Sequence, residues 1–567
     1  MGIQWPSDGP LQTLPAVVEE MVQRRPEAVS LYDHTRVEPA VYTFGQVLSH
    51  MRQAALVLQA HGVRPGETVA ILAPNGAFFL SSFLGVQRAG GIPVPLYAPV
   101  TMRRLQEYWG QLLSWLRWTD VCGLIVTRDL LETGLAPQLS EVSSLRFVLT
   151  EEAFLDDPGG KLPALHRDGE RLAFIQYTSG TTGRKRGVMV SHRNILDNTH
   201  AIAQSTCMTG TDLMVSWLPM AHDMGLIGAI LTPLTVGFPV LLMMPLHFLL
   251  RPIVWLQAIT TYRGTLTVAP NFGYQRCVSQ IRSAELAGVD LSSLRAVFSG
   301  SEPVLPQTIE AFSTRFAPYG FRQETFVPAY GLAESTLAVT LKPPAEPLCY
   351  DAIDYDLLIS QGQAVGSDPA GRTVVMCSVG RCVPGTTLQV VDASGIPVPE
   401  RTVGEIILRG RSVTQGYYHD QESTAACYRH GWLYTGDYGY LAAGHLFITG
   451  RKQDLIIQRG RNYYPHDFEQ AVSAVPHIYA GGVVAFGLSS EAEGTERIIL
   501  MVETRLEAAT DRDALITECH QRIRNQLGIS VDEVILVPPS FVPKTTSGKI
   551  SRAESRRLFL QLDRKTP

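Results

Sequence analysis

The chain has 567 residues, 45% hydrophobic and 18% charged, and this composition excludes a disordered or fibrous protein. At roughly 100–200 residues per domain, the length predicts about three or four structural units. With 48 Lys and Arg against 53 Asp and Glu, the net charge is −5, and nothing in the charge pattern indicates a nucleic-acid partner. The eight cysteines are too scattered for a disulfide framework or a zinc site, so buried free thiols are expected. The N-terminal residues carry no secretory pattern, and the expected location is cytoplasmic.

The first half of the chain alternates helical and strand patterns. Thr43 to Gln46 form a capping box, which predicts a helix that ends at His61-Gly62. A second helix is predicted over residues 78–87. Strands are predicted at 68–72, 90–96, 122–126, 147–149, 172–176, 213–217 and 240–244. This alternation predicts parallel sheets that helices cover on both faces.

Residues 224–250 contain no Asp, Glu, Lys or Arg and would be long enough to span a bilayer. Three prolines and three glycines interrupt the segment, however, and a break at residues 237–239 separates a helix-like part from a strand-like part. We therefore predict a buried helix and a central strand of a parallel sheet rather than a membrane span.

The pattern changes after about residue 375. Short strands at 387–391, 404–409 and 446–449 predict a small β subdomain, and residues from 451 onward have their own strands (482–486, 498–502) and a helix near 511–527. The predicted fold class is therefore α/β. We expect a large N-terminal domain, residues 1–450, of parallel sheets with covering helices plus the β subdomain, and a small α+β C-terminal domain, residues 451–567.

Residues 177–188 form a Gly- and hydroxyl-rich loop between a predicted strand and a helix start at Ser191. Gly180, Gly183 and Gly187 let backbone N–H groups approach an anion, and Arg184 to Arg186 add positive charge. Four hydroxyls can donate to phosphate oxygens, those of Thr178, Ser179, Thr181 and Thr182. The spacing is not that of a Walker A loop. The pattern favours a phosphate-binding loop over a flexible loop with a solvated basic tip.

Five further motifs follow in order along the chain. They are Gly300-Ser-Glu-Pro303, Tyr330-Gly-Leu-Ala-Glu-Ser335, Tyr434-Thr-Gly-Asp437, Gly450-Arg451 with Asp454, and Pro543 to Lys549. Together with the loop, they resemble the adenylate-forming (AMP-binding) superfamily over essentially the whole chain. A second set resembles one branch, the fatty acyl-AMP ligases: Trp217-Leu-Pro219, His222 to Gly228, Ala269 to Phe272, and Arg459 to Tyr464.

The resemblance implies that the protein uses ATP and Mg²⁺ to convert a carboxylate into an acyl-adenylate and pyrophosphate, after which a thiol takes the acyl group. It implies catalytic roles for Lys549, Arg186 and Glu334, with Glu334 also binding Mg²⁺, because hard cations suit carboxylate oxygens. Implied nucleotide contacts are Thr178, Ser179, Gly180, Thr181, Thr182, Gly183, Gly300, Ser301, Glu302, Ala329, Tyr330, Gly331, Leu332, Asp437 and Arg451. The segment around Lys549 is expected to be exposed.

The resemblance also implies a mobile small domain with its hinge at Asp454. It places the acyl chain near His222, Met224, Gly225 and Ile227, although an interior histidine and a plain apolar core would give the same residues. The loop departs from the family pattern, because Lys185-Arg186-Gly187 stands where Pro-Lys-Gly is usual, and Gln453 replaces the lysine before the hinge.

The leading functional interpretation is a fatty acyl-AMP ligase that passes its acyl group to the phosphopantetheine thiol of a separate carrier protein. Residues 343–376 resemble the insertion of these enzymes, and their apolar residues (Ile353, Tyr355, Leu357, Leu358 and Ile359) are expected to anchor it against the main domain. The alternative for this segment is a surface loop. The alternative functions are a fatty acyl-CoA synthetase and a non-catalytic acyl- or nucleotide-binding relative.

Overall fold

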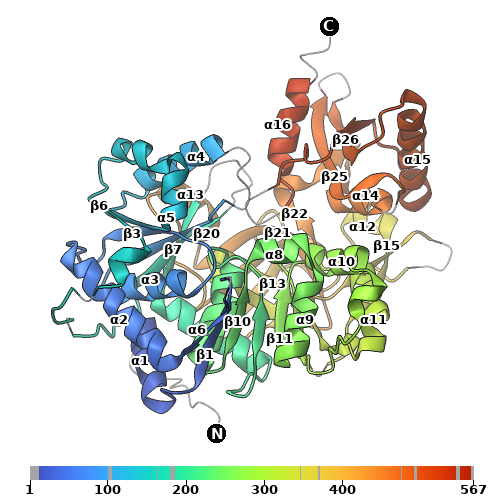
Figure 1. Cartoon of the computed structure of the whole chain (residues 1–567). Coiled ribbons are helices and arrows are strands. Elements are labelled where there is room, and N and C mark those ends of the chain that lie inside the picture. Colours follow the sequence, from blue (N-terminus) through green and yellow to red (C-terminus); the bar gives the residue numbers. More distant parts are fainter. Residues whose placement is uncertain are drawn as a thin grey trace.

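The computed structural model describes residues 12–36, 38–99, 105–156, 158–162, 164–178, 186–344, 346–367, 371–473, 475–490, 494–544 and 549–562. It has the α/β architecture that the sequence predicts (Figure 1). Parallel sheets make up the N-terminal half, and smaller, mainly antiparallel sheets follow them.

The largest sheet contains nine strands in the order β17-β14-β13-β12-β11-β9-β10-β1-β2. Its six inner strands pair in parallel, and β2, β14 and β17 add antiparallel pairings at the edges. The strands are β1 (Val29–His34), β2 (Ala40–Thr43), β9 (Met214–Ser216), β10 (Val240–Met243), β11 (Leu266–Ala269), β12 (Ala296–Ser299), β13 (Phe326–Gly331), β14 (Ala338–Leu341) and β17 (Arg381–Cys382). Among the helices of this half are α6 (His192–Ser205), α9 (Ile253–Tyr262), α10 (Asn271–Gln280) and α11 (Pro306–Phe316). The residues of β10, β11 and β12 are all buried, as expected for a sheet with two covered faces.

A second, fully parallel sheet has the order β4-β3-β5-β6. Its strands are β3 (Thr68–Leu72), β4 (Ile92–Leu96), β5 (Gly123–Val126) and β6 (Phe147–Leu149), and the nearby helices are α2 (Phe44–Ala60), α3 (Ala77–Arg88) and α4 (Leu105–Trp118). The predicted capping box is confirmed, because Thr43 Oγ1 accepts from the Gln46 backbone N–H at 3.2 Å while the Gln46 side chain accepts from Thr43.

The prediction that residues 172–176 form a strand of a parallel sheet is wrong. They belong to β7 (Leu172–Thr178), which pairs antiparallel with β8 (Arg186–Ser191). The chain continues as a strand after the loop because the buried Val188 and Val190 extend the apolar pattern. Only then does Ser191 begin α6, with a capping box to Asn194. The predicted phosphate loop therefore connects two strands of a hairpin, and its residues 179–185 lie outside the described residues.

The uncharged segment 224–250 folds as predicted into buried helix and strand. A π-helix, η4 (Met224–Leu231), leads into α7 (Thr232–Val236), and Gly237 ends this helix in the left-handed conformation with φ 90°. β10 then runs between β1 and β9, and α8 (Pro245–Leu250) follows. Among the residues that the structure describes, no helix has both the length and the apolar character to cross a membrane.

The small β subdomain is an antiparallel sheet. Its strands are β18 (Thr386–Val391), β19 (Gly404–Gly410), β20 (Tyr428–Arg429), β21 (Trp432–Ala442) and β22 (His445–Arg451). The predicted insertion forms a β-hairpin of β15 (Tyr350–Asp354) and β16 (Thr373–Cys377) that encloses α12 (Tyr355–Gln361).

The C-terminal residues form a three-stranded sheet with flanking helices, drawn in orange to red in Figure 1. Its elements are β23 (Ile456–Gln458), β24 (Arg461–Tyr463), α14 (Pro465–Val472), β25 (Ile478–Ser490), β26 (Thr495–Thr504), α15 (Ala509–Leu527), β27 (Glu533–Val537) and α16 (Arg552–Leu562). The yellow α12 and β15 lie beside α14.

The insertion packs differently from the sequence-based expectation. Ile353 and Leu358 share a core cluster with Tyr440 and Phe447 of the β subdomain and with Tyr464. Tyr355 and Ile359 instead join the core of the C-terminal elements, and Leu357 is only half-buried. The insertion therefore contacts both parts of the protein rather than the main domain alone.

The cysteines are free thiols, as predicted, but they are not all buried. Cys122, Cys277, Cys377 and Cys519 are buried, whereas Cys207 and Cys382 are exposed. Cys382 is exposed because it lies on the short edge strand β17.

Candidate active site

A large cleft brings together the predicted site residues from all parts of the chain. Its walls come from the carboxyl ends of β12 and β13, the β7–β8 hairpin, the start of η4, the strands β21 and β22, and the C-terminal elements. The lining includes Thr178, Arg186, Gly300, Ser301, Glu302, Ala329, Tyr330, Gly331, Leu332, Glu334, Asp437, Arg451, Asp454 and Lys549. Ser179, Gly180, Thr181, Thr182 and Gly183 lie outside the described residues.

Asp437 lines this cleft and is held between two side chains. The hydroxyl of Tyr330 donates to Asp437 Oδ2 at 2.7 Å, and Arg451 Nε lies 3.3 Å from Oδ1. The β21–β22 register places Asp437 directly opposite Arg451. Burial, reinforced by the negative charge of Asp437, raises the pKa of Tyr330 well above its usual value, so its hydroxyl remains a donor. The carboxylate is thus fixed as an acceptor that faces the cleft.

Glu334 follows β13 in the short helix η8 (Ala333–Ser335). Its Oε1 accepts a hydrogen bond from the Tyr417 hydroxyl at 2.8 Å, and its backbone carbonyl accepts from Thr414 N at 2.9 Å. Burial raises the pKa of Glu334 because it disfavours the charged carboxylate, and the hydrogen bond from Tyr417 only partly opposes this shift. A cation bound at this carboxylate would therefore offset a real cost of burial.

Lys549 lies among charges from distant segments. Burial lowers the pKa of Lys549, and the positive charge of Arg451 lowers it further, while the carboxylates of Asp223, Glu302 and Asp437 oppose that shift. Lys549 is half-buried, whereas Lys544 in the same segment is exposed. The expectation of an exposed segment is therefore wrong for Lys549, because the cleft encloses it.

Glu302 and Asp223 are tied to the ends of helices. Glu302 Oε2 accepts from the Phe272 backbone N–H at 3.0 Å, in the first turn of α10. Asp223 Oδ1 lies 2.6 Å from Met224 N and 2.5 Å from His222 Nδ1, at the start of η4. Burial alone would raise the pKa of Asp223, but His222, Lys549 and the Met224 N–H together hold it below the usual value. Asp223 belongs to a motif that the sequence singled out, yet no role was predicted for it.

The sequence of this chain matches a known enzyme family. Residues 18–418 match the model of the family described as AMP-binding enzyme. The chain belongs to this family. It is 32% identical to the putative fatty-acid–CoA ligase FadD21 of Mycobacterium tuberculosis, over 92% of this chain and 93% of that protein. It is 31% identical to the medium-chain-fatty-acid–[acyl-carrier-protein] ligase JamA of Moorena producens, over 94% and 92%.

A solved structure supports the same assignment. One of the fatty acyl-adenylate ligases from E. coli and L. pneumophila superposes with a TM-score of 0.90 at 32% identity, covering 99% of each chain. This AMP-binding enzyme is therefore an adenylate-forming ligase of the fatty acyl ligase group.

The cleft of this AMP-binding enzyme extends into an apolar part. His222 and Met224 lie on its wall, whereas Gly225 and Ile227 are buried outside the lining. Gly225 serves packing instead, because a Cβ atom there would meet the Pro219 carbonyl oxygen at 2.1 Å. The apolar side chains that line this part include Met214, Trp217, Leu218, Val268, Phe298, Leu337 and Leu341. Trp217 and Leu218 belong to a motif that the sequence singled out. The other five lie far apart along the chain, so no local sequence pattern connects them.

Asp454 forms an ion pair with Arg552, which also contacts a second C-terminal helix. Its Oδ2 lies 3.3 Å from Arg552 Nη1 at the start of α16, and Arg552 Nη2 lies 2.7 Å from Glu469 Oε2 of α14. The predicted hinge residue is therefore ion-paired to the part of the chain that it would move.

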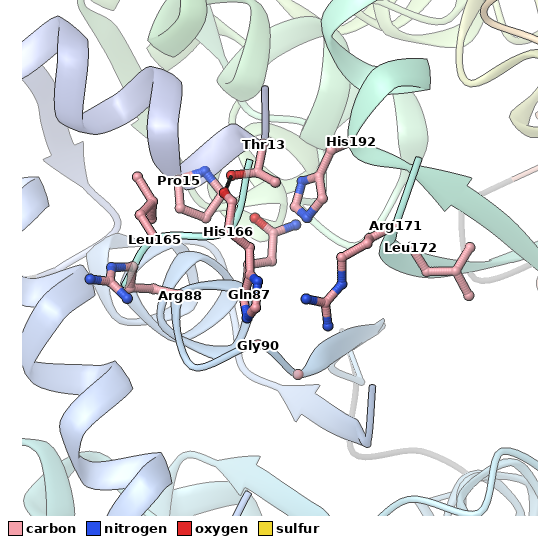
Figure 2. A pocket seen from close by; sticks show the side chains of 11 residues that line it. Thr13, Pro15, Gln87, Arg88, Gly90, Leu165, His166, Arg171, Leu172 and His192 are labelled. Carbon is pink, nitrogen blue, oxygen red and sulfur yellow. Dashed lines mark hydrogen bonds between the residues drawn. The ribbon is translucent and has the colours of Figure 1, made fainter. Parts of the chain in front are cut away.

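A second, small pocket lies at the N-terminal helix α1 (Leu14–Arg24) and contains several basic side chains (Figure 2). Thr13 Oγ1 donates to the His166 carbonyl oxygen at 2.7 Å, and His192 Nδ1 accepts from Leu14 N at 3.2 Å. Burial lowers the pKa of His192 to about 3, so it remains neutral, and Arg88 pairs with Glu19. These groups attach α1 to the domain.

Within the described ranges, no group of three or more His, Cys, Asp or Glu side chains could hold a metal ion.

Proposed function

We propose that this protein is a fatty acyl-AMP ligase that uses ATP and Mg²⁺ to form an acyl-adenylate and passes the acyl group to the phosphopantetheine thiol of a carrier protein. Two relatives support the two halves of this proposal: one solved relative is a fatty acyl-adenylate ligase, and JamA is an acyl-carrier-protein ligase.

The proposed roles follow from the charges in the cleft. Lys549 supplies positive charge where the carboxylate and the α-phosphate meet, and Arg186 with the loop 178–183 contacts the other phosphates. Asp437 accepts hydrogen bonds from the ribose hydroxyls while Arg451 holds its carboxylate in place. Tyr330 with residues 300–302, 329, 331 and 332 forms the adenine slot. The buried carboxylate of Glu334 suits Mg²⁺, which would neutralise charge on the phosphates.

The observation that carries the choice of acceptor is the position of the insertion. Arg372 forms an ion pair with Asp356 of α12, and its Nη1 donates to the Leu527 carbonyl oxygen at the end of α15. Together with Tyr355 and Ile359, this contact ties the C-terminal elements to the insertion. We propose that residues 451–567 form the mobile domain and that this tie opposes its rotation about Asp454, which disfavours CoA as the acceptor.

A pyrophosphate-release assay with a panel of fatty acids tests the first step. Acid-dependent release by the intact enzyme supports the proposal, and no release with any acid would favour a non-catalytic binding protein. The acceptor is tested separately by measuring acyl-CoA and acyl-carrier formation by the same enzyme. Efficient acyl-CoA formation would favour the alternative of a fatty acyl-CoA synthetase, the activity that the name of FadD21 indicates for that relative.

A further inference from the structure

Tyr417 lies between two of the proposed site residues, Arg186 and Glu334. Its hydroxyl donates to Glu334 Oε1 at 2.8 Å, and the guanidinium carbon of Arg186 lies 5.1 Å from the centre of its ring. The side chain is buried and lines the cleft. One residue thus contacts both the strand that ends the phosphate loop and the carboxylate proposed for Mg²⁺.

The backbone around Tyr417 is held as firmly as its side chain. Tyr417 forms an antiparallel bridge with Val188 of β8, and Tyr418 N donates to the Gly187 carbonyl oxygen at 2.7 Å. On the other side, Thr414 N donates to the Glu334 carbonyl oxygen at 2.9 Å. Residues 414–418 therefore join β8 to η8, and the ring has little freedom to move away from either partner.

We infer that Tyr417 is a positioning residue that fixes the Glu334 carboxylate for Mg²⁺ and keeps it aligned with Arg186. The inference rests on the proposed function. A hydroxyl that bonds one carboxylate oxygen orients the entire carboxylate. The loss of such a hydrogen-bond partner of a metal ligand typically weakens metal binding by about 10–100-fold. The ring has a separate role as the surface on which the Arg186 guanidinium lies.

Tyr417→Phe separates these two roles, because it removes the hydroxyl and keeps the ring. Tyr428→Phe is the matched control: Tyr428 lies edge-on to Tyr417 at 6.4 Å between ring centres, but its hydroxyl bonds to Thr414 Oγ1 at 2.8 Å. The measurements are the Mg²⁺ dependence of pyrophosphate release at saturating ATP and fatty acid, Mn²⁺ binding in the presence of ATP, and the unfolding temperature without ligand.

Tyr417→Phe is expected to raise the Mg²⁺ concentration for half-maximal rate and the Kd for Mn²⁺ by on the order of tenfold, with saturating Mg²⁺ restoring most of the rate. Tyr428→Phe is expected to leave both unchanged. An unchanged metal dependence in a folded Tyr417→Phe enzyme would overturn the inference. A Tyr417→Phe enzyme whose unfolding temperature falls while its metal dependence stays the same would also overturn it.

A double variant tests the assignment to Glu334. If Tyr417 acts through this carboxylate, Tyr417→Phe should change metal binding little in a Glu334→Gln background, and additive effects would contradict the inference. Failure of the proposed function looks different. An intact enzyme that binds Mn²⁺ with ATP but releases no pyrophosphate would refute the activity, while the binding data still test the role of Tyr417.

Discussion

Individual side chains connect parts of this enzyme that are far apart in the sequence. Lys549 shares its surroundings with Asp223, Glu302 and Asp437, which come from three distant parts of the chain. These carboxylates only partly oppose the lowering of the Lys549 pKa by burial and by Arg451. The positive charge of Lys549 is therefore less stable here than in water. Such a group is suited to stabilising charge that develops during the reaction.

We expect Lys549→Ala to reduce the rate of acyl-AMP formation by roughly 10²–10³-fold, because one cation aimed at the developing charge is lost. Pyrophosphate release with a saturating fatty acid measures this. Lys161→Ala is the control, because Lys161 is exposed and lies outside the cleft lining. A Lys549→Ala enzyme with the wild-type rate would contradict the proposed role.

The pH profile gives a second test of Lys549. Its pKa lies below the usual 10.5, so the lysine loses its charge at a lower pH than an exposed lysine would. We expect acyl-AMP formation to decline on the alkaline side before pH 10.5 is reached. Lys549→Arg should lose this decline, because a guanidinium stays charged, and an identical decline in both enzymes would assign it to another group.

Substitutions of Arg186 test whether its positive charge or its planar guanidinium matters more for ATP binding. Its guanidinium lies over the Tyr417 ring, and an ammonium can make a similar but weaker contact. We expect Arg186→Lys to raise the KM for ATP less than Arg186→Ala does, because charge at the phosphates matters more than the planar fork. Equal KM values for the two variants would show that Arg186 acts through its specific geometry.

Some of the site residues could be identified from the sequence and others could not, for physical reasons. Glu334, Asp437, Arg451 and Lys549 belong to ordered motifs, so the sequence alone could single them out, and the structure brings them into one cleft. Tyr417 could not be found, because its partners lie in β8 and η8 and nothing in the local pattern Gly-Tyr-Tyr indicates them.

At the scale of single elements, the sequence predicted helix starts reliably, because a helix start depends on hydrogen bonds between neighbouring residues. The capping box at Thr43 and the helix start at Ser191 are both confirmed. The pairing of β7 was not predictable from its apolar run, because strand direction depends on which neighbour the chain returns to. The π-helical form of η4 also escaped prediction, since a local apolar pattern does not distinguish it from an α-helix.

Gly225 shows how closely η4 approaches its surroundings. An added Cβ would lie 2.1 Å from the Pro219 carbonyl oxygen, which is backbone and has little room to move. We expect Gly225→Ala to lower the free energy of unfolding by about 1–3 kcal/mol. Denaturant unfolding measures this, with Gly110→Ala as the matched control: Gly110 also lies in a helix, but nothing lies within 4 Å of an added Cβ. The control should be neutral or slightly stabilising.

At the scale of the whole molecule, the insertion contacts both the β subdomain and the C-terminal elements. Composition and periodicity predict the sheets, and the ordered motifs predict which residues form the site. The double contact of α12 could not be predicted, because one short amphipathic helix has apolar residues on two sides and the sequence does not say what each side meets. Ile353 and Leu358 face the β subdomain core, and Tyr355 and Ile359 face the C-terminal core.

This division allows the proposed restraint on the C-terminal domain to be weakened without removing the insertion. We expect the double variant Tyr355→Ala/Ile359→Ala to form acyl-CoA more than tenfold faster than the intact enzyme, with acyl-AMP formation unchanged. Each truncation of a buried side chain costs about 2–5 kcal/mol, and a shift of 1.4 kcal/mol in the rotation equilibrium is already about tenfold. Acyl-CoA formation and pyrophosphate release are measured in parallel.

The same helix supplies the control. Leu357→Ala removes a half-buried side chain of α12 that belongs to neither core cluster, so it should leave acyl-CoA formation low. If the double variant unfolds at a lower temperature without gaining acyl-CoA formation, the insertion acts as a structural brace and does not select the acceptor. If the intact enzyme already forms acyl-CoA efficiently at ordinary CoA concentrations, the tie at α12 does not restrain the domain, and the synthetase activity takes the place of the proposed one.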